Sequence, residues 1–286
     1  MLRLISLVFD KNDLRHSEKL RDNRFRWLSE LGATEVSEAA HDAAGFLFGY
    51  ENGDEPYRNL VANRPNLRDR PEERQELVRL DRILQRLAAR GVELPMPRTW
   101  IIGVDDPPPH DLKFPLFVRT PKSSWKRGGD QSRVNNLRQL NDEIELLRRA
   151  FGWDAPILAR QWIDVAVAGQ WMFGDAPQEI RVWIVDAAPV AWSFHYLHVV
   201  QSPAGFPPTP HDLSLLAELA GKIGAAFNAR LIAADFLRDR CGGWHFVEAG
   251  PGAVSGTAHE SVFKFVAEKL RGGQAELHAD RVGGQL

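Results

Sequence analysis

The 286-residue sequence contains one cysteine, Cys241, so it can form neither an intrachain disulfide nor a zinc site made of several cysteines. It has no apolar run long enough to span a bilayer, and its first segment becomes polar at Asp10, which is too early for a signal peptide. The formal net charge is only −2, which argues against a global field that would attract nucleic acid or anionic membranes. These features predict a cytoplasmic protein whose charged contacts are local.

Several motifs of nucleotide-binding proteins and hydrolases are also absent. The sequence has no Gly-x-x-x-x-Gly-Lys-Ser/Thr loop, no Gly-x-Gly-x-x-Gly after a strand, no His-Glu-x-x-His and no Gly-x-Ser-x-Gly. These absences argue against ordinary phosphate-loop, Rossmann and hydrolase proteins. With 44% hydrophobic residues, the chain can nevertheless bury a substantial core in one large or two smaller domains.

The most informative feature that is present is a pair of acidic residues, Asp235 and Glu248, in two apolar runs separated by a polar turn. This pattern predicts a β-hairpin, and a four-residue loop from Arg240 to Gly243 places the two carboxylates opposite each other. Like charges in this arrangement are destabilising unless a cation lies between them or one is protonated. The register therefore predicts a divalent metal site, with Mg²⁺ as the first choice. A slip by one residue would instead leave both carboxylates solvated.

A second segment combines an apolar strand, Phe114 to Arg119, with a following loop rich in serine, glycine and cations. Backbone amides of such a loop can approach phosphate oxygens, and an arginine adds a forked donor that suits them. The segment is thus typical of a phosphate-binding site. Two alternatives stay open: a solvated basic surface, or a local nucleic-acid contact in which an aromatic residue among cations stacks on a base. The residues of that contact would be Lys122, Trp125, Lys126, Arg127 and Arg133.

Further elements complete the expected organisation. A helix is predicted from Pro71 to Gly91, and two alternating strands joined at Ala187 and Ala188 place Glu179, Arg181 and Trp183 on one face. His195 and His198 have no acidic partner that the sequence identifies, so we expect them to be packed or surface residues.

The ordered set of motifs resembles the ATP-grasp ligases. The matching segments are 114–129, Ile157-Leu-Ala-Arg-Gln-Trp-Ile-Asp, Asp235, Glu248-Ala-Gly-Pro-Gly and the helix-then-proline stretch from Asp81, within about residues 80–270. The resemblance implies an α/β (α+β) ATP-grasp fold in which two α+β lobes enclose the nucleotide. The expected parts are an N-terminal α/β pre-grasp domain (1–95), a nucleotide-covering lobe (96–164), a C-terminal metal-binding lobe (165–271) and a disordered tail (272–286).

The resemblance also implies roles for individual residues. Arg119 and Arg82 match two cations that contact the ATP phosphates, where the family usually has lysine, and Asp235 and Glu248 match the magnesium-binding acids. Arg181 matches a contact to phosphate or to an acyl-phosphate intermediate, with a cross-strand ion pair on a solvated face as an equal alternative. The implied nucleotide contacts also include Ser123, Ser124 and Gly128 of the covering loop, Gln161, Trp162 and Ile163 of the adenine hinge, and Asp164 at the ribose.

Two positions depart from the family pattern. Gly250 stands where the family normally has an asparagine ligand, which puts a second Mg²⁺ in doubt, and Arg160 stands where it often has glutamate. The resemblance implies an ATP- and Mg²⁺-dependent ligase that joins a small-molecule or peptide carboxylate to an amine through an acyl phosphate. The two departures favour an alternative, a nucleotide-binding module of the same fold that no longer ligates.

Overall fold

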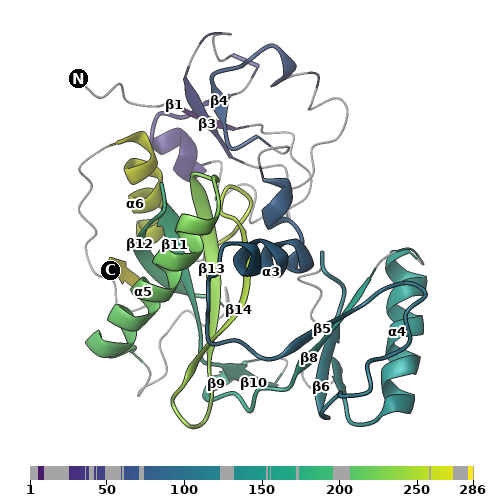
Figure 1. Cartoon of the computed structure of the whole chain (residues 1–286). Coiled ribbons are helices and arrows are strands. Elements are labelled where there is room, and N and C mark those ends of the chain that lie inside the picture. The colour runs from purple at the N-terminus through teal and green to yellow at the C-terminus, as the bar shows by residue number, and fades with distance from the viewer. Residues whose placement is uncertain are drawn as a thin grey trace.

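Four β-sheets organise the part of the chain that the computed structural model describes (Figure 1). The N-terminal sheet is parallel, with strand order β2-β1-β3-β4, whereas the other three are antiparallel. Its strands are β1 (Ser6–Phe9), β2 (Thr34–Glu35), β3 (Gly45–Leu47) and β4 (Leu67–Arg68). The described residues are 6–9, 26–35, 37–38, 42, 44–48, 59, 61–70, 74–122, 132–152, 154, 156–171, 174–195, 207–257, 259–272 and 283–285.

The segment predicted as one helix from Pro71 to Gly91 forms two shorter elements. A 3₁₀ turn, η1 (Gln75–Leu77), precedes α3 (Leu80–Ala89), and Pro71 itself lies outside the described residues. The prediction of a continuous helix is wrong because the backbone is extended at Arg79. This break lets the Leu80 N–H donate a hydrogen bond to the Pro121 carbonyl at 3.0 Å, which ties the start of α3 to the segment after β6.

A four-stranded sheet in the order β5-β8-β6-β7 forms the lobe that carries Arg119 (Figure 1). The helix α4 covers it and contributes Leu140, Ile144 and Leu147 to a shared core. The Asn136 side chain caps this helix by accepting a hydrogen bond from the Gln139 N–H at 3.0 Å. The elements are β5 (Thr99–Ile102), β6 (Leu116–Arg119), β7 (Arg133–Val134), α4 (Leu137–Phe151) and β8 (Ile157–Gln161).

The central sheet has the order β14-β13-β11-β12-β15 and is covered by a helix on each face. Alternate residues of β11 therefore enter different cores, with Val182 packing in the α5 core and Trp183 in the α6 core. No helix in the described segments is long and apolar enough to cross a membrane. The elements are β11 (Glu179–Val185), β12 (Ala188–Phe194), α5 (Pro210–Ala226), β13 (Leu231–Arg238), β14 (Trp244–Pro251), α6 (Glu260–Arg271) and β15 (Gly283–Gln285), and a separate ribbon pairs β9 (Val167–Trp171) with β10 (Gly174–Pro177).

Two predicted details of this sheet differ from the structure. The β11–β12 turn lies at Asp186 and Ala187, both with positive φ, one residue earlier than predicted. A two-residue hairpin turn of this kind needs positive φ at both positions. The tail also contains a strand, since residues 283–285 pair with β12. This glycine-rich segment can pair because backbone hydrogen bonds to a free strand edge need no large side chain.

Candidate functional site

Asp235 and Glu248 lie opposite each other in the β13–β14 ladder, which confirms the predicted register. The route to this register differs from the prediction, because the connection is one residue longer, spanning 239–243. Arg238 consequently pairs with Trp244, and the ladder is restored by a register shift at Val247 between the Phe236 and Asp235 pairs. A β-bulge of this kind inserts one extra residue into one strand. The longer loop and the bulge therefore offset each other.

The carboxylate of Asp235 is bound by Arg181, its direct partner on β11. Nε of Arg181 donates to Oδ1 and Nη2 donates to Oδ2, both at 2.8 Å, while Nη1 donates to the Gly256 carbonyl at 2.8 Å. Burial lowers the pKa of Arg181, but the charge and hydrogen bonds of Asp235, together with Glu248 and Glu179, more than offset this and raise it. Arg181 thus forms the cross-strand ion pair considered from the sequence, although the pair is buried and not on a solvated face.

Glu248 is bound by an arginine from the other lobe. Nη1 of Arg119, at the end of β6, donates to Oε2 of Glu248 at 2.6 Å, and both side chains are mostly buried. This contact joins the four-stranded sheet to the central sheet at the predicted metal site. Arg119, Arg181, Asp235 and Glu248 are therefore brought together, as the sequence predicted.

Arg160 of β8 lies next to this group and is almost fully buried, with 3% of its surface exposed. Its Nε donates to Oγ1 of Thr99 at 3.1 Å, and its two terminal nitrogens donate to the carbonyls of Val247 and Phe246. Burial lowers the pKa of Arg160 to about 9, the nearby Arg119 charge acts in the same direction, and Glu248 opposes it. The residue is charged at neutral pH and contributes a third cation to the site.

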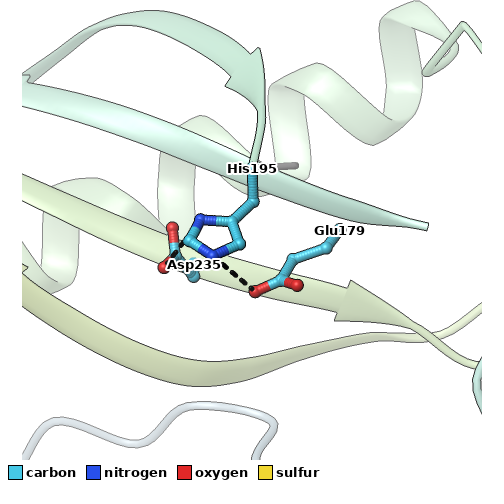
Figure 2. Close-up of side chains that lie close together, drawn as sticks. All are labelled: Glu179, His195 and Asp235. Atoms are coloured by element: carbon cyan, nitrogen blue, oxygen red, sulfur yellow. Dashed lines mark ion pairs between the residues drawn. The ribbon is translucent and has the colours of Figure 1, made fainter. Parts of the chain in front are cut away.

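His195 also belongs to the site, contrary to the prediction that it is a packed or surface residue (Figure 2). Its Nδ1 lies 3.4 Å from Oδ2 of Asp235 and its Nε2 lies 4.0 Å from Oε1 of Glu179. One ligand atom from each residue falls within 4.8 Å of the others, as a metal site requires. We assign no metal here, because the two acids face different nitrogens of the ring and Arg181 already binds both oxygens of Asp235. His198 lies outside the described residues.

The same distances test whether Mg²⁺ fits at Asp235 and Glu248. Two facing carboxylates are hard oxygen donors of the kind that Mg²⁺ prefers. Glu248 fits this role, since it bonds Arg119 through Oε2 and its side chain is 17% exposed. Asp235 fits only after a rearrangement, because its side chain is 2% exposed and both oxygens accept hydrogen bonds from Arg181.

The adenine hinge predicted at Gln161 to Ile163 follows the end of β8. Two of its N–H groups are already engaged, with Gln161 donating to the Arg98 carbonyl at 2.8 Å and Trp162 to the Pro115 carbonyl at 3.1 Å. Ile163 is then the hinge residue whose N–H can serve a base. The Arg133 guanidinium lies 5.0 Å from the centre of the Trp162 ring, so this cation stacks at the hinge.

Other predicted site residues are placed elsewhere or cannot be placed. Arg82 is exposed on α3, and no contact within the described part of the chain links it to the acidic pair. Asp164 lies at the hairpin turn, where its carbonyl accepts a hydrogen bond from the Arg240 N–H at 2.9 Å and its side chain is 70% exposed. Ser123, Ser124 and Gly128 lie outside the described residues, as do Trp125, Lys126 and Arg127 of the nucleic-acid alternative.

Sequence reasoning missed Glu179 and His195 as a pair and noted Arg160 only as a departure. The His195 N–H donates to the Glu179 carbonyl at 3.2 Å, so the two residues are neighbours across the β11–β12 hairpin. A turn placed at Asp186 and Ala187 would have indicated this pairing. The contacts of Arg160 cross between two sheets, and no local pattern in the sequence indicates them.

Comparison with known proteins identifies the family. A family model described as an ATP-grasp domain, the third family of its clade, matches residues 102–269, whereas no curated protein sequence matches the chain. Similar solved structures include D-alanine–D-alanine ligase from Bacillus anthracis complexed with ATP (14% identity, TM-score 0.60, 94% of this chain and 97% of that one). L-amino acid ligase from Bacillus licheniformis is 13% identical, with a TM-score of 0.58 and coverage of 99% and 80%. N5-carboxyaminoimidazole synthase from Aspergillus clavatus is 14% identical, with a TM-score of 0.63 and coverage of 97% and 79%.

At these identities the solved structures show a common fold, which confirms the predicted ATP-grasp architecture. The family model covers more than half of the sequence, from the end of β5 to the last turns of α6. The chain therefore belongs to the ATP-grasp family.

Proposed function

We propose that the protein is an ATP-dependent ligase that joins a carboxylate to an amine through an acyl-phosphate intermediate. The observation that carries this proposal is the convergence of two arginine–carboxylate pairs, Arg119 with Glu248 and Arg181 with Asp235, at facing positions of one hairpin. Paired cations and acids supply both kinds of group that a metal-bound triphosphate needs. Two of the similar structures are ligases of amino acids by name, which favours an amino-acid or peptide substrate.

In this proposal the arginines bind phosphate oxygens. Arg119 exchanges its contact with Glu248 for a phosphate oxygen, and Arg181 stabilises charge on the transferred group. Arg82 is a more distant phosphate contact. Glu248 would hold Mg²⁺, joined by Asp235 if Arg181 releases it. When bound, Mg²⁺ offsets the negative charge that develops on the phosphates.

The hinge would hold the base. The Ile163 N–H offers a donor to a ring nitrogen of adenine, and the Trp162 carbonyl offers an acceptor to its amino group. Gln161 shapes the strand end but has committed its N–H to Arg98. Ser123, Ser124 and Gly128 would close over the phosphates, while Asp164 would approach the ribose only by leaving Arg240.

The chemistry requires two displacements. A carboxylate oxygen of the first substrate attacks the γ-phosphorus, and the bond from that phosphorus to ADP breaks. The amine nitrogen of the second substrate then attacks the acyl carbon, inorganic phosphate leaves and the nitrogen loses a proton. The protein contributes mainly positioning and electrostatic stabilisation to these steps.

The test is ADP release from Mg²⁺-ATP in the presence of mixed amino acids and dipeptides. We expect release by the wild-type protein, its loss in Glu248→Gln, and no change in Glu218→Gln, which alters an exposed acid paired with Lys222 on α5. Full activity of Glu248→Gln would contradict the assignment of Glu248. A wild-type protein that does not bind ATP would contradict the proposal as a whole.

A second candidate function is a nucleotide-binding module that does not ligate. The buried contact between Arg181 and Asp235 favours it, because it occupies one of the two acids, and Gly250 offers no side-chain oxygen next to the other. Such a module would bind ATP in calorimetric titration but release no ADP with any carboxylate and amine offered.

A further inference from the structure

The strand that carries Glu248 lies at an edge of the central sheet. β14 pairs only with β13 among the described strands, so one row of its backbone groups faces away from the ladder. The Phe246 N–H points outward and donates to the Pro95 carbonyl at 2.8 Å. Val247, one residue on, is the bulged residue that the ladder leaves unpaired. An edge strand with a bulge needs hydrogen-bond partners from elsewhere in the protein.

Arg160 supplies these partners from the neighbouring sheet. Nη1 donates to the Val247 carbonyl, Nη2 donates to the Phe246 carbonyl at 3.4 Å, and Nε is held by Oγ1 of Thr99 at 3.1 Å. Burying a guanidinium is costly unless its hydrogen bonds are made, and a planar fork can reach acceptors that a lysine cannot reach together. The three bonds thus connect β5, β8 and the bulge of β14.

The bulge determines which residue faces Asp235. Below the bulge, Phe236 pairs with Phe246, and a regular continuation of that register would place Val247 opposite Asp235. A shift of one residue turns every side chain to the other face of the strand. Without the bulge, Glu248 would therefore leave the face on which Arg119 and Asp235 lie.

We propose that Arg160 is a positioning residue, which holds the β14 bulge and so keeps Glu248 opposite Asp235 and within reach of Arg119. The register part of this inference needs no enzyme activity. The catalytic part rests on the proposed ligase function. Because Arg160 acts through backbone carbonyls, its effect on catalysis would come from the placement of Glu248 and not from contact with a substrate.

The first experiment measures amide hydrogen exchange in residues 244–251 of the full-length protein. We expect Arg160→Lys and Arg160→Met to exchange about tenfold to hundredfold faster there, because local opening loses charged hydrogen bonds. The matched control is Arg148→Lys, since Nη2 of Arg148 also donates to a carbonyl, that of Gly103 at 2.6 Å, but within its own lobe. Thr99→Val, which removes only the acceptor of Nε, gives a milder change if the Arg160 variants fail to fold.

A kinetic experiment separates positioning from general destabilisation. In Arg160→Lys we expect kcat to fall on the order of a hundredfold and the Mg²⁺ requirement to rise about tenfold, while KM for ATP changes little. Unchanged exchange in 244–251 in both Arg160 variants would overturn the inference. If the wild-type protein releases no ADP, the proposed function fails, and the exchange result alone decides the role of Arg160.

Discussion

Arg181 and Asp235 are direct cross-strand partners whose side chains share two hydrogen bonds of 2.8 Å inside the central sheet. The same forked geometry occurs between Arg230 and Asp186, where the bonds are 2.7 and 2.6 Å but the aspartate is 53% exposed. The chain thus contains two ion pairs of one geometry in two environments. They allow the effect of burial to be measured within one protein.

Arg181→Met should lower the free energy of unfolding by about 3–5 kcal/mol, because it leaves the Asp235 carboxylate buried without its main partner. Arg230→Met should lower it by about 1 kcal/mol or less, since water replaces the partner of Asp186. Urea unfolding of both variants measures the difference. Equal losses would mean that the Arg181 pair is not sequestered from water.

Gly250→Asn should fold normally and strengthen Mg²⁺ binding. A Cβ at Gly250 would meet only Oγ of Ser255, at 4.0 Å, so the site has room for the side chain. The added amide oxygen lies two residues from Glu248 on the same face of the strand. Calorimetric titration of Mg²⁺ with ATP checks the gain, and Gly250→Ala serves as the control that adds bulk without an oxygen. No gain over the alanine variant would argue against a metal held by Glu248.

Glu248→Gln should bind Mg²⁺-free ATP more tightly than the wild-type protein, by about fivefold to tenfold, although it loses Mg²⁺-dependent turnover. The Glu248 carboxylate competes with ATP for Arg119, and its removal releases this cation for a phosphate. Titration with ATP in the presence of a chelator measures the effect. Weaker binding than that of the wild type would show that Arg119 does not contact the nucleotide.

Asp212→Asn should cost about 1 kcal/mol at pH 7 and much less near pH 3. Burial raises the pKa of Asp212, but hydrogen bonds from Trp244 and Thr209, with the Arg238 charge, outweigh this and lower it. A carboxyl group with a lowered folded-state pKa stabilises the fold above its unfolded pKa, and this contribution disappears as the pH falls. Unfolding curves at both pH values check this, with Asp142→Asn on the exposed face of α4 as the control. A cost independent of pH would point to lost packing.

How much of this site the sequence predicted depends on the distance along the chain over which each contact acts. The pairing of Asp235 with Glu248 followed from alternation around one turn, and Arg119 was placed at a strand end by its apolar run. The loop length was wrong by one residue, and the bulge that offsets it leaves no pattern in the sequence. The register of the hairpin was therefore predicted correctly from an incorrect turn.

The contacts that were missed all depend on how separate elements pack. Arg160 reaches carbonyls more than eighty positions away, and its value as a donor becomes visible only when β8 and β14 are side by side. His195 depends on a turn that was misplaced by one residue. The helix predicted through Arg79 was interrupted because tertiary hydrogen bonding at Leu80 outweighs local propensity.

Pro115 has a consequence for the choice of base. Trp162 donates its N–H to the Pro115 carbonyl, and an antiparallel ladder would normally return a bond from residue 115 to the Trp162 carbonyl. Proline has no N–H, so this return bond cannot form. The Trp162 carbonyl keeps its capacity to accept from an exocyclic amine, which adenine has at its sixth ring position, whereas guanine carries a carbonyl there that would repel it. A missing hydrogen atom in one strand thus favours adenine over guanine in the next.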